Sequence, residues 1–230
     1  MTAIASLYDE SGNMVKDWAM AGYNCHCFDL LGTPRTEQFG KGSITWYALD
    51  VLSEETALLI HKLQPSLVFG FPPCTDVSVS GAAHFEKKFR ENPDNMAEAA
   101  ELARRVAWLA ASVGAAWMIE NPVSMLLHFL GDPDYKFDPF EFGGYLPEDD
   151  IHPRWPDYIA PRDAYPKETW IWASDDFVFP EKAPVYCPPG WSAQATKLGG
   201  KSAKTKQIRS ETPRGYAKAV FMANRGRHPL

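Results

Sequence analysis

The sequence is organised around residues 68–81, which read Val-Phe-Gly-Phe-Pro-Pro-Cys-Thr-Asp-Val-Ser-Val-Ser-Gly. The apolar start predicts a short strand, and the two prolines stiffen the turn after it because each fixes its own φ at about −65°. Cys74 follows them, so we expect its thiol on a rigid loop just past a strand end, where open α/β sheets place their ligands. A buried structural cysteine is the alternative interpretation of this loop.

Two further stretches extend this pattern. Residues 117–122 (Trp-Met-Ile-Glu-Asn-Pro) predict an apolar strand that delivers Glu120 and Asn121. Residues 3–14 (Ala-Ile-Ala-Ser-Leu-Tyr-Asp-Glu-Ser-Gly-Asn-Met) predict an N-terminal strand, a turn of small residues and the start of a helix. The chain thus presents a nucleotide-type first turn, then a thiol, then a carboxylate.

With these motifs in this order, the chain resembles the DNA cytosine-5 methyltransferase family. The resemblance covers residues 3–130, with a further fragment at 209–224 that begins Arg-Ser-Glu-Thr-Pro-Arg. Its specific part is the pairing of Pro-Pro-Cys with Glu-Asn-Pro. It implies a Rossmann-like sheet that binds S-adenosylmethionine, with cytosine-containing DNA as the partner.

The resemblance also implies roles for individual residues. Cys74 would add to C6 of a flipped cytosine, Glu120 would donate a proton at N3, and Asn121 would orient the base edge. The implied cofactor contacts are Tyr8, Asp9, Ser11, Gly12, Asn13, Asp29, Asp50 and Pro72, with Asp29 at the ribose hydroxyls and Asp50 at the adenine. The implied nucleic-acid contacts are Ser78, Ser80, Lys204, Lys206, Arg209 and Arg214.

The chain departs from the family pattern at several points. Glu10 stands in the first turn where a glycine is expected, although Gly12 remains, and Gly215 stands where glutamate is usual. The region that corresponds to target recognition is far smaller than usual, which favours a relaxed sequence preference, help from another subunit or a smaller substrate. Two other functions therefore stay open: a pyrimidine-modifying enzyme that acts on a free cytosine nucleotide, and a non-catalytic DNA-binding relative.

Composition supports a globular protein. The 230 residues are 45% hydrophobic and 23% charged, and no apolar run approaches the length of about 18 that would span a membrane. With no leader segment, we expect a soluble cytoplasmic protein whose cysteines are free. Cys25-His26-Cys27 predicts no metal site, because successive residues of a strand point to opposite faces and zinc sites usually space their cysteines by two to four residues. No feature of the sequence indicates a particular oligomeric state.

The net charge of −6 is unevenly distributed. Residues 197–230 contain nine basic residues and one acidic residue, whereas the remainder contains 14 basic and 28 acidic residues. This asymmetry predicts a segment that faces a polyanion on an otherwise acidic body. A solvated basic tail is the alternative.

The alternation of elements predicts an α/β fold with a parallel sheet. Expected strands are 3–7, 23–28, 44–49, 67–69 and 115–119, and expected helices are 13–21, 53 to before 65, 95–113, 124–130 and 213–224. Residues 1–130 form the expected cofactor-binding core. Residues 131–205 form a small irregular insertion rich in proline and aromatic residues, with a strand at 167–173 returning to the sheet edge, and residues 206–230 carry a helix back to the core.

Overall fold

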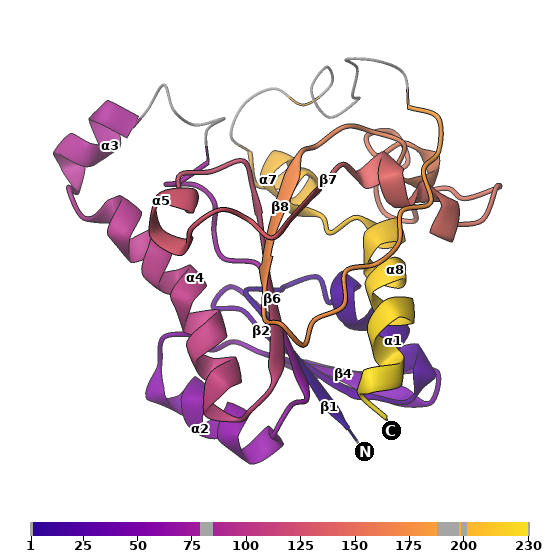
Figure 1. Ribbon diagram of the computed structural model, residues 1–230, viewed down its shortest axis with the longest axis horizontal. Coiled ribbons are helices and arrows are strands. Elements are labelled where there is room, and N and C mark those ends of the chain that lie inside the picture. The colour runs from indigo at the N-terminus through magenta and orange to yellow at the C-terminus, as the bar shows by residue number, and fades with distance from the viewer. Residues whose placement is uncertain (1, 79–84, 188–197, 199–201, 230) are drawn as a thin grey trace.

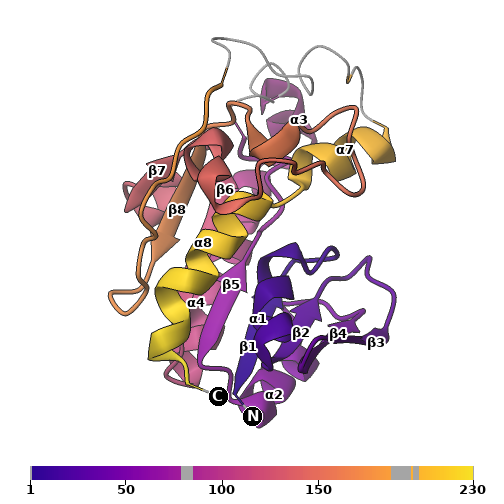
Figure 2. The same ribbon diagram turned by 90° about the vertical axis from the view of Figure 1, so that its right-hand side faces the viewer.

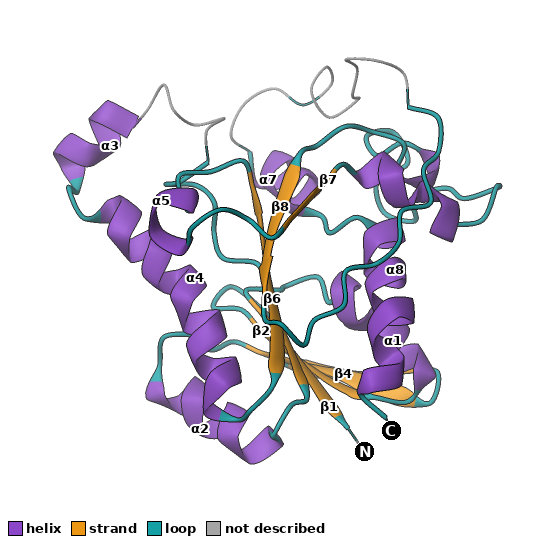
Figure 3. Ribbon diagram, viewed as in Figure 1, coloured by secondary structure: helices purple, strands orange, loops and turns teal. Residues whose placement is uncertain are grey.

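The computed structural model describes residues 2–78, 85–187, 198 and 202–229 (Figure 1). One mixed sheet of eight strands carries helices on both faces (Figure 3), so the predicted α/β class is confirmed. The strands are β1 (Ala3–Leu7), β2 (Asn24–Phe28), β3 (Arg35–Phe39), β4 (Gly42–Tyr47), β5 (Leu67–Gly70), β6 (Ala116–Pro122), β7 (Tyr135–Phe137) and β8 (Thr169–Ala173). Their order across the sheet is β3-β4-β2-β1-β5-β6-β8-β7.

Helices bury a separate apolar cluster on each face of the sheet. The described α-helices are α1 (Lys16–Ala21), α2 (Glu54–Leu63), α3 (Phe85–Glu91), α4 (Asn95–Ser112), α5 (Leu127–Leu130), α7 (Ala203–Ser210) and α8 (Arg214–Asn224). Figures 1 and 2 show α2 and α4 on one face and α1 and α8 on the other. Val68 packs with Ile60 of α2, whereas its neighbour Phe69 packs with Trp18 of α1, because successive strand residues face opposite sides. No helix in the described part of the chain has the length and apolar character needed to cross a membrane.

The centre of the sheet is parallel, as predicted. β4, β2, β1, β5 and β6 all run in the same direction. The chain adds β2 and β4 on one side of β1, and then β5 and β6 on the other side, so the strand order reverses between β1 and β5. Ligands of open α/β sheets bind outside the carboxyl ends of the strands at such a point. The amide of Phe71 donates to the carbonyl of Leu7 at 3.0 Å, so the segments leaving these two strands lie side by side.

Local sequence signals set the ends of several helices. Ser53 caps α2, because its hydroxyl accepts a hydrogen bond from the amide three residues later at 3.1 Å. Gly22, with φ of 118°, ends α1. The helix expected over 13–21 begins with a 3-10 turn (Asn13–Val15) and becomes α-helical at Lys16, and the Asn13 side chain donates to Glu211 and forms no capping bond.

Residues 131–205 contribute two strands to the sheet. The strand expected over 167–173 forms as β8, but it lies between β6 and β7, pairing antiparallel with both, and not at the edge. This pairing reaches Pro122, so Glu120 and Asn121 lie within β6 and not beyond its end. Neither β7 nor β3 was predicted, and β3 forms an exposed antiparallel hairpin with β4.

Candidate active site

A cavity of about 420 Å³ lies where β1 and β5 end. Its wall comes from the turn after β1, the loop after β5, the end of β6 and the residues that precede α8. The predicted catalytic and cofactor residues that line it are Cys74, Glu120, Asn121, Tyr8, Asp9, Ser11, Asp29 and Pro72. Arg209, which was predicted to bind nucleic acid, lines it as well. The fold thus brings the separate sequence motifs to one place.

The turn after β1 is held by its own side chains. Asp9 is buried, and its carboxylate accepts hydrogen bonds from the hydroxyls of Ser6 and Ser11 and from the amide of Gly12, at 2.7 to 2.8 Å. Tyr8 has a φ of 59°, and its hydroxyl donates to a backbone carbonyl of α4 at 3.0 Å. Such a left-handed conformation is uncommon for a bulky residue, and strain of this kind concentrates at functional sites. Asp9 therefore shapes the turn, with both of its oxygens engaged inside the protein.

The loop after β5 fixes a half-buried thiol. The carbonyl of Cys74 accepts hydrogen bonds from the amides of Val77 at 3.2 Å and Ser78 at 2.8 Å, which closes a turn. The side-chain amide of Asn121 donates to the carbonyl of Pro72 at 3.0 Å, and this bond ties β6 to the loop. Together with the two prolines, these bonds restrict where the thiol lies relative to β6.

Glu120 and Cys74 are coupled electrostatically. The Glu120 Oε1 atom is buried and has no hydrogen-bond partner among the described residues. Burial raises the pKa of the Glu120 carboxyl, and the charge of Lys167 opposes that effect. Burial also raises the pKa of the Cys74 thiol; the Glu120 carboxylate raises this pKa further and Lys167 lowers it. Ionisation of either acidic group therefore disfavours ionisation of the other.

Lys167 is a functional candidate that the sequence analysis missed. It lines the cavity, and its charge acts on both Cys74 and Glu120. Its backbone amide donates to Asp138 at 2.6 Å, which anchors the segment that leads into β8. No motif marks this lysine, and only the pairing of β8 with β6 brings its segment to the thiol.

Acidic groups gather at the part of the cavity that β2 contributes. Asp29 follows β2, and its Oδ1 atom accepts a hydrogen bond from the amide of Leu31 at 2.8 Å. Burial raises the pKa of the Asp29 carboxyl; the bond from Leu31 opposes this, and the charges of Glu10 and Asp9 add to it. Glu10 and Arg35 line the same cavity. The carboxyl groups of Asp29, Asp9 and Glu10 favour a ligand that presents hydroxyl or ammonium hydrogens.

Two of the predicted cofactor residues support the turn without lining this cavity. Gly12 has a φ of 70°, and a Cβ atom there would lie 2.8 Å from the Cζ2 atom of Trp46. Glycine is therefore required both by the backbone and by the neighbouring indole. Asn13 donates to Glu211, whose other oxygen accepts a hydrogen bond from the Trp155 indole at 3.2 Å. Asn13 thus links the first turn to residues far along the chain.

Asp50, the predicted adenine contact, also lies outside the lining of this cavity. Its side chain is exposed, and the Oδ1 atom accepts a hydrogen bond from the amide of Leu52 at 2.9 Å. Its carbonyl accepts hydrogen bonds from the hydroxyls of Ser53 and Thr56, both at 2.7 Å. In this structure Asp50 organises the start of α2.

The predicted nucleic-acid contacts are dispersed. Ser78 is buried and forms a single antiparallel bridge with Ser124, away from the cavity wall. Ser80 lies outside the described residues. Lys204 and Lys206 are exposed on α7, so contact between these lysines and phosphates stays a prediction.

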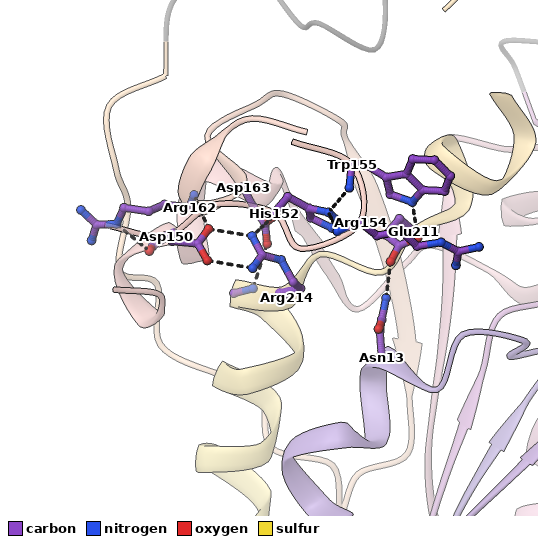
Figure 4. Close-up of polar contacts among 11 residues, drawn as sticks. Asn13, Asp150, His152, Arg154, Trp155, Arg162, Asp163, Glu211 and Arg214 are labelled. Carbon is purple, nitrogen blue, oxygen red and sulfur yellow. Dashed lines mark hydrogen bonds and ion pairs between the residues drawn. The ribbon is translucent and has the colours of Figure 1, made fainter. Parts of the chain in front are cut away.

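Arg214 is held by an internal ion pair. Its Nη1 and Nη2 atoms donate to the two carboxylate oxygens of Asp150 at 2.7 and 2.6 Å, and Asp163 lies 3.6 Å from Nη2 (Figure 4). A bidentate pair of this kind is among the stronger polar contacts in proteins. Both terminal nitrogens of the guanidinium are thus engaged inside the protein, and Arg214 anchors α8 to the preceding loops. Its predicted contact with nucleic acid stays a prediction.

No family model matches the chain, and no curated protein matches it either. The residues at the cavity are therefore what indicates the function of this chain.

Proposed function

We propose that the protein is an S-adenosylmethionine-dependent DNA cytosine-5 methyltransferase. The observation that carries this proposal is the meeting of Cys74 and Glu120 at one cavity where the strand order reverses. Addition to C6 of cytosine requires a nucleophile and an acid, and a thiol coupled to a buried carboxyl supplies both. The resemblance implied the same two residues from the motifs alone.

The cavity fits S-adenosylmethionine in its acidic part. A carboxylate after the second strand of a Rossmann-like sheet accepts hydrogen bonds from ribose hydroxyls. Of the two carboxylate oxygens of Asp29, Oδ1 alone accepts a hydrogen bond from within the described part of the chain. Glu10 adds a second carboxylate to this wall of the cavity. The wall therefore suits the hydroxyls and the ammonium group of S-adenosylmethionine and repels its carboxylate. When bound, the cofactor would supply an electrophilic methyl group.

The side chains of the protein would divide the remaining chemistry. Cys74 would react as the thiolate: its sulfur forms a bond to C6 as the C5–C6 double bond opens, electron density moves to N3, and the Glu120 carboxyl donates its proton there. Asn121 Nδ2 donates to the carbonyl of Pro72, and the buried Oδ1 atom has no partner among the described residues. This Oδ1 atom would accept a hydrogen bond from the N4 amino group of cytosine. After transfer, loss of the C5 proton to a base would re-form the C5–C6 double bond, release the Cys74 sulfur as a thiolate and return the N3 proton to Glu120.

Basic residues near the cavity favour a polyanionic substrate. Arg154 and Arg209 line the cavity together with Lys167, and Lys204 and Lys206 are exposed on α7, whose last residues also line the cavity. Phosphate contacts of this type supply most of the affinity of DNA-binding proteins without specifying sequence. This arrangement favours DNA over a free nucleotide.

We expect the purified protein to transfer a labelled methyl group from S-adenosylmethionine to cytosine-containing duplex DNA. Base-resolution sequencing of the product should locate the label at cytosine C5. Transfer to dCMP and not to DNA would replace this proposal with the nucleotide enzyme. DNA binding without transfer to either substrate would support the non-catalytic alternative.

The cofactor proposal predicts different effects for two aspartates. S-adenosylmethionine should raise the melting temperature of the protein, because a ligand that binds only the folded state stabilises it. Asp29→Ala should weaken cofactor binding about tenfold or more, since hydrogen bonds to a charged group are lost. Asp50→Asn, outside the cavity lining, is the matched control and should retain the shift. An equal loss in both variants would restore the adenine contact at Asp50, and no shift in the unmodified protein would remove the cofactor.

A further inference from the structure

A second cavity of about 420 Å³ adjoins the first. It lies between the first turn and α1, the loop that contains His152, and the start of α8. Ser11, Arg154 and Glu211 line both cavities. Nothing in the proposed methyl transfer uses this second space.

His152 lines this cavity and carries a buried hydrogen-bond donor. The side chain is 2% exposed, and its Nδ1 atom accepts hydrogen bonds from the amides of Trp155 at 2.9 Å and Arg154 at 3.3 Å. Burial lowers the pKa of His152 to about 4, helped by the charge of Arg214, so the ring is neutral near pH 7. Because Nδ1 accepts, the proton of the neutral ring is on Nε2. That Nε2 atom is buried and has no partner among the described residues.

Arg214 supplies a second donor of the same kind. Its two terminal nitrogens bond Asp150, but its Nε atom is buried and has no partner within the described part of the chain. His152 and Arg214 line the same cavity, and Figure 4 shows them as neighbours. Buried polar groups are normally hydrogen-bonded, so two unpartnered N–H donors at one cavity indicate an absent acceptor.

The charges around the cavity indicate the nature of that acceptor. Lys16, Lys218 and Arg154 line it, and none of them forms a salt bridge within the described part of the chain. The charges of Lys218 and Lys16 act on Asp17, where they oppose the rise in pKa that burial causes. Of the two acidic residues, Glu211 already accepts hydrogen bonds at both oxygens, and Asp17 alone faces the three cations. The surroundings therefore favour an anion.

We propose that this second cavity binds a phosphate group whose oxygens accept hydrogen bonds from His152 Nε2 and Arg214 Nε. A phosphate carries several acceptor oxygens, so it can satisfy both donors and still face Lys16 and Lys218. Free phosphate and the backbone phosphate of a nucleic acid share this chemistry. The site does not depend on the methyl transfer proposed above.

Titration calorimetry with inorganic phosphate tests the site without a methyl donor. The unmodified protein should bind phosphate saturably in a chloride buffer of constant ionic strength. His152→Asn should weaken this binding about tenfold or more, because asparagine keeps an acceptor for the Trp155 amide but loses the donor at Nε2. Lys218→Gln should weaken it less, and Lys62→Gln, on α2 and outside both cavities, should leave it unchanged.

Comparison between variants separates phosphate binding at this cavity from phosphate binding elsewhere on the protein. Absence of saturable binding would mean that water alone meets the two donors, and equal affinity in His152→Asn would place the phosphate elsewhere; either result overturns the proposal. If His152→Asn does not fold, Lys218→Gln must still lower the affinity, or the proposal fails.

A short cytosine-containing duplex distinguishes the two sources of phosphate. If a backbone phosphate occupies the cavity, free phosphate should compete with the duplex, and His152→Asn should weaken binding of both ligands. If the occupant is free phosphate, His152→Asn should change phosphate affinity and leave duplex affinity unchanged. Either pattern supports the site and leaves the methyltransferase proposal to its own assay.

Discussion

Replacement of Cys74 with serine is expected to lower methyl transfer more than about 10³-fold, in line with the loss of a nucleophile in other enzymes. A neutral hydroxyl is a far weaker nucleophile than a thiolate, so the bond to C6 would not form. Methyl transfer to duplex DNA measures the loss. Cys187→Ser is the matched control, since Cys187 is also a half-buried cysteine but lies outside the cavity lining.

The same variant should also fail to form a covalent adduct. Duplex DNA that contains 5-fluorocytosine should trap the unmodified protein when the methyl donor is present, because fluorine cannot leave C5 as a cation and the sulfur stays bonded to C6. A denaturing gel would show a protein–DNA band for the unmodified protein and for Cys187→Ser. If Cys74→Ser still methylated DNA, the covalent mechanism would be excluded and the loop after β5 would be a structural turn.

The parallel centre of the fold could be predicted because its signals are local. Apolar runs such as residues 67–69, followed by proline or an acidic residue, indicate strands. The helices between these strands have their own caps, as at Ser53. The formation of β3 and the position of β8 depend instead on pairing with other strands. β3 is exposed and polar and forms because it pairs with β4, and the place of β8 is set by antiparallel pairing with β6 at distant positions in the chain.

The same distinction between local signals and distant pairing applies to the residues of the candidate site. Cys74, Glu120 and Asp29 could be predicted, since each follows or ends a strand and therefore comes to the same edge of the sheet. Lys167 and His152 could not, because their importance arises from tertiary placement and from burial without a partner. Arg214 was predicted from a motif, but its ion pair with Asp150 depends on a loop with no recognisable periodicity.

Glu120→Gln should change turnover and thiol reactivity in opposite directions. Turnover should fall about 10²- to 10⁴-fold, the range that general acid catalysis contributes, because an amide can hydrogen-bond to N3 but cannot donate a proton of comparable acidity. The Glu120 carboxylate raises the pKa of Cys74, so a neutral glutamine should lower that pKa. The thiolate fraction of Cys74 limits its reaction at about pH 8 because its pKa is raised, so the variant should react faster with iodoacetamide at Cys74.

Peptide mapping of the alkylated protein separates this effect from a general loosening of the fold. Cys187 is the internal reference, and its alkylation rate should not change in Glu120→Gln. Lys167→Met should slow alkylation of Cys74, because Lys167 lowers the pKa of the thiol and the variant removes that charge. Opposite changes in the Cys74 alkylation rate in Glu120→Gln and Lys167→Met indicate an effect of charge. Damage to packing would change this rate in the same direction in both variants. Unchanged Cys74 reactivity in both variants would mean that the thiol and the carboxyl are not coupled, and the division of roles between nucleophile and acid would have to be abandoned.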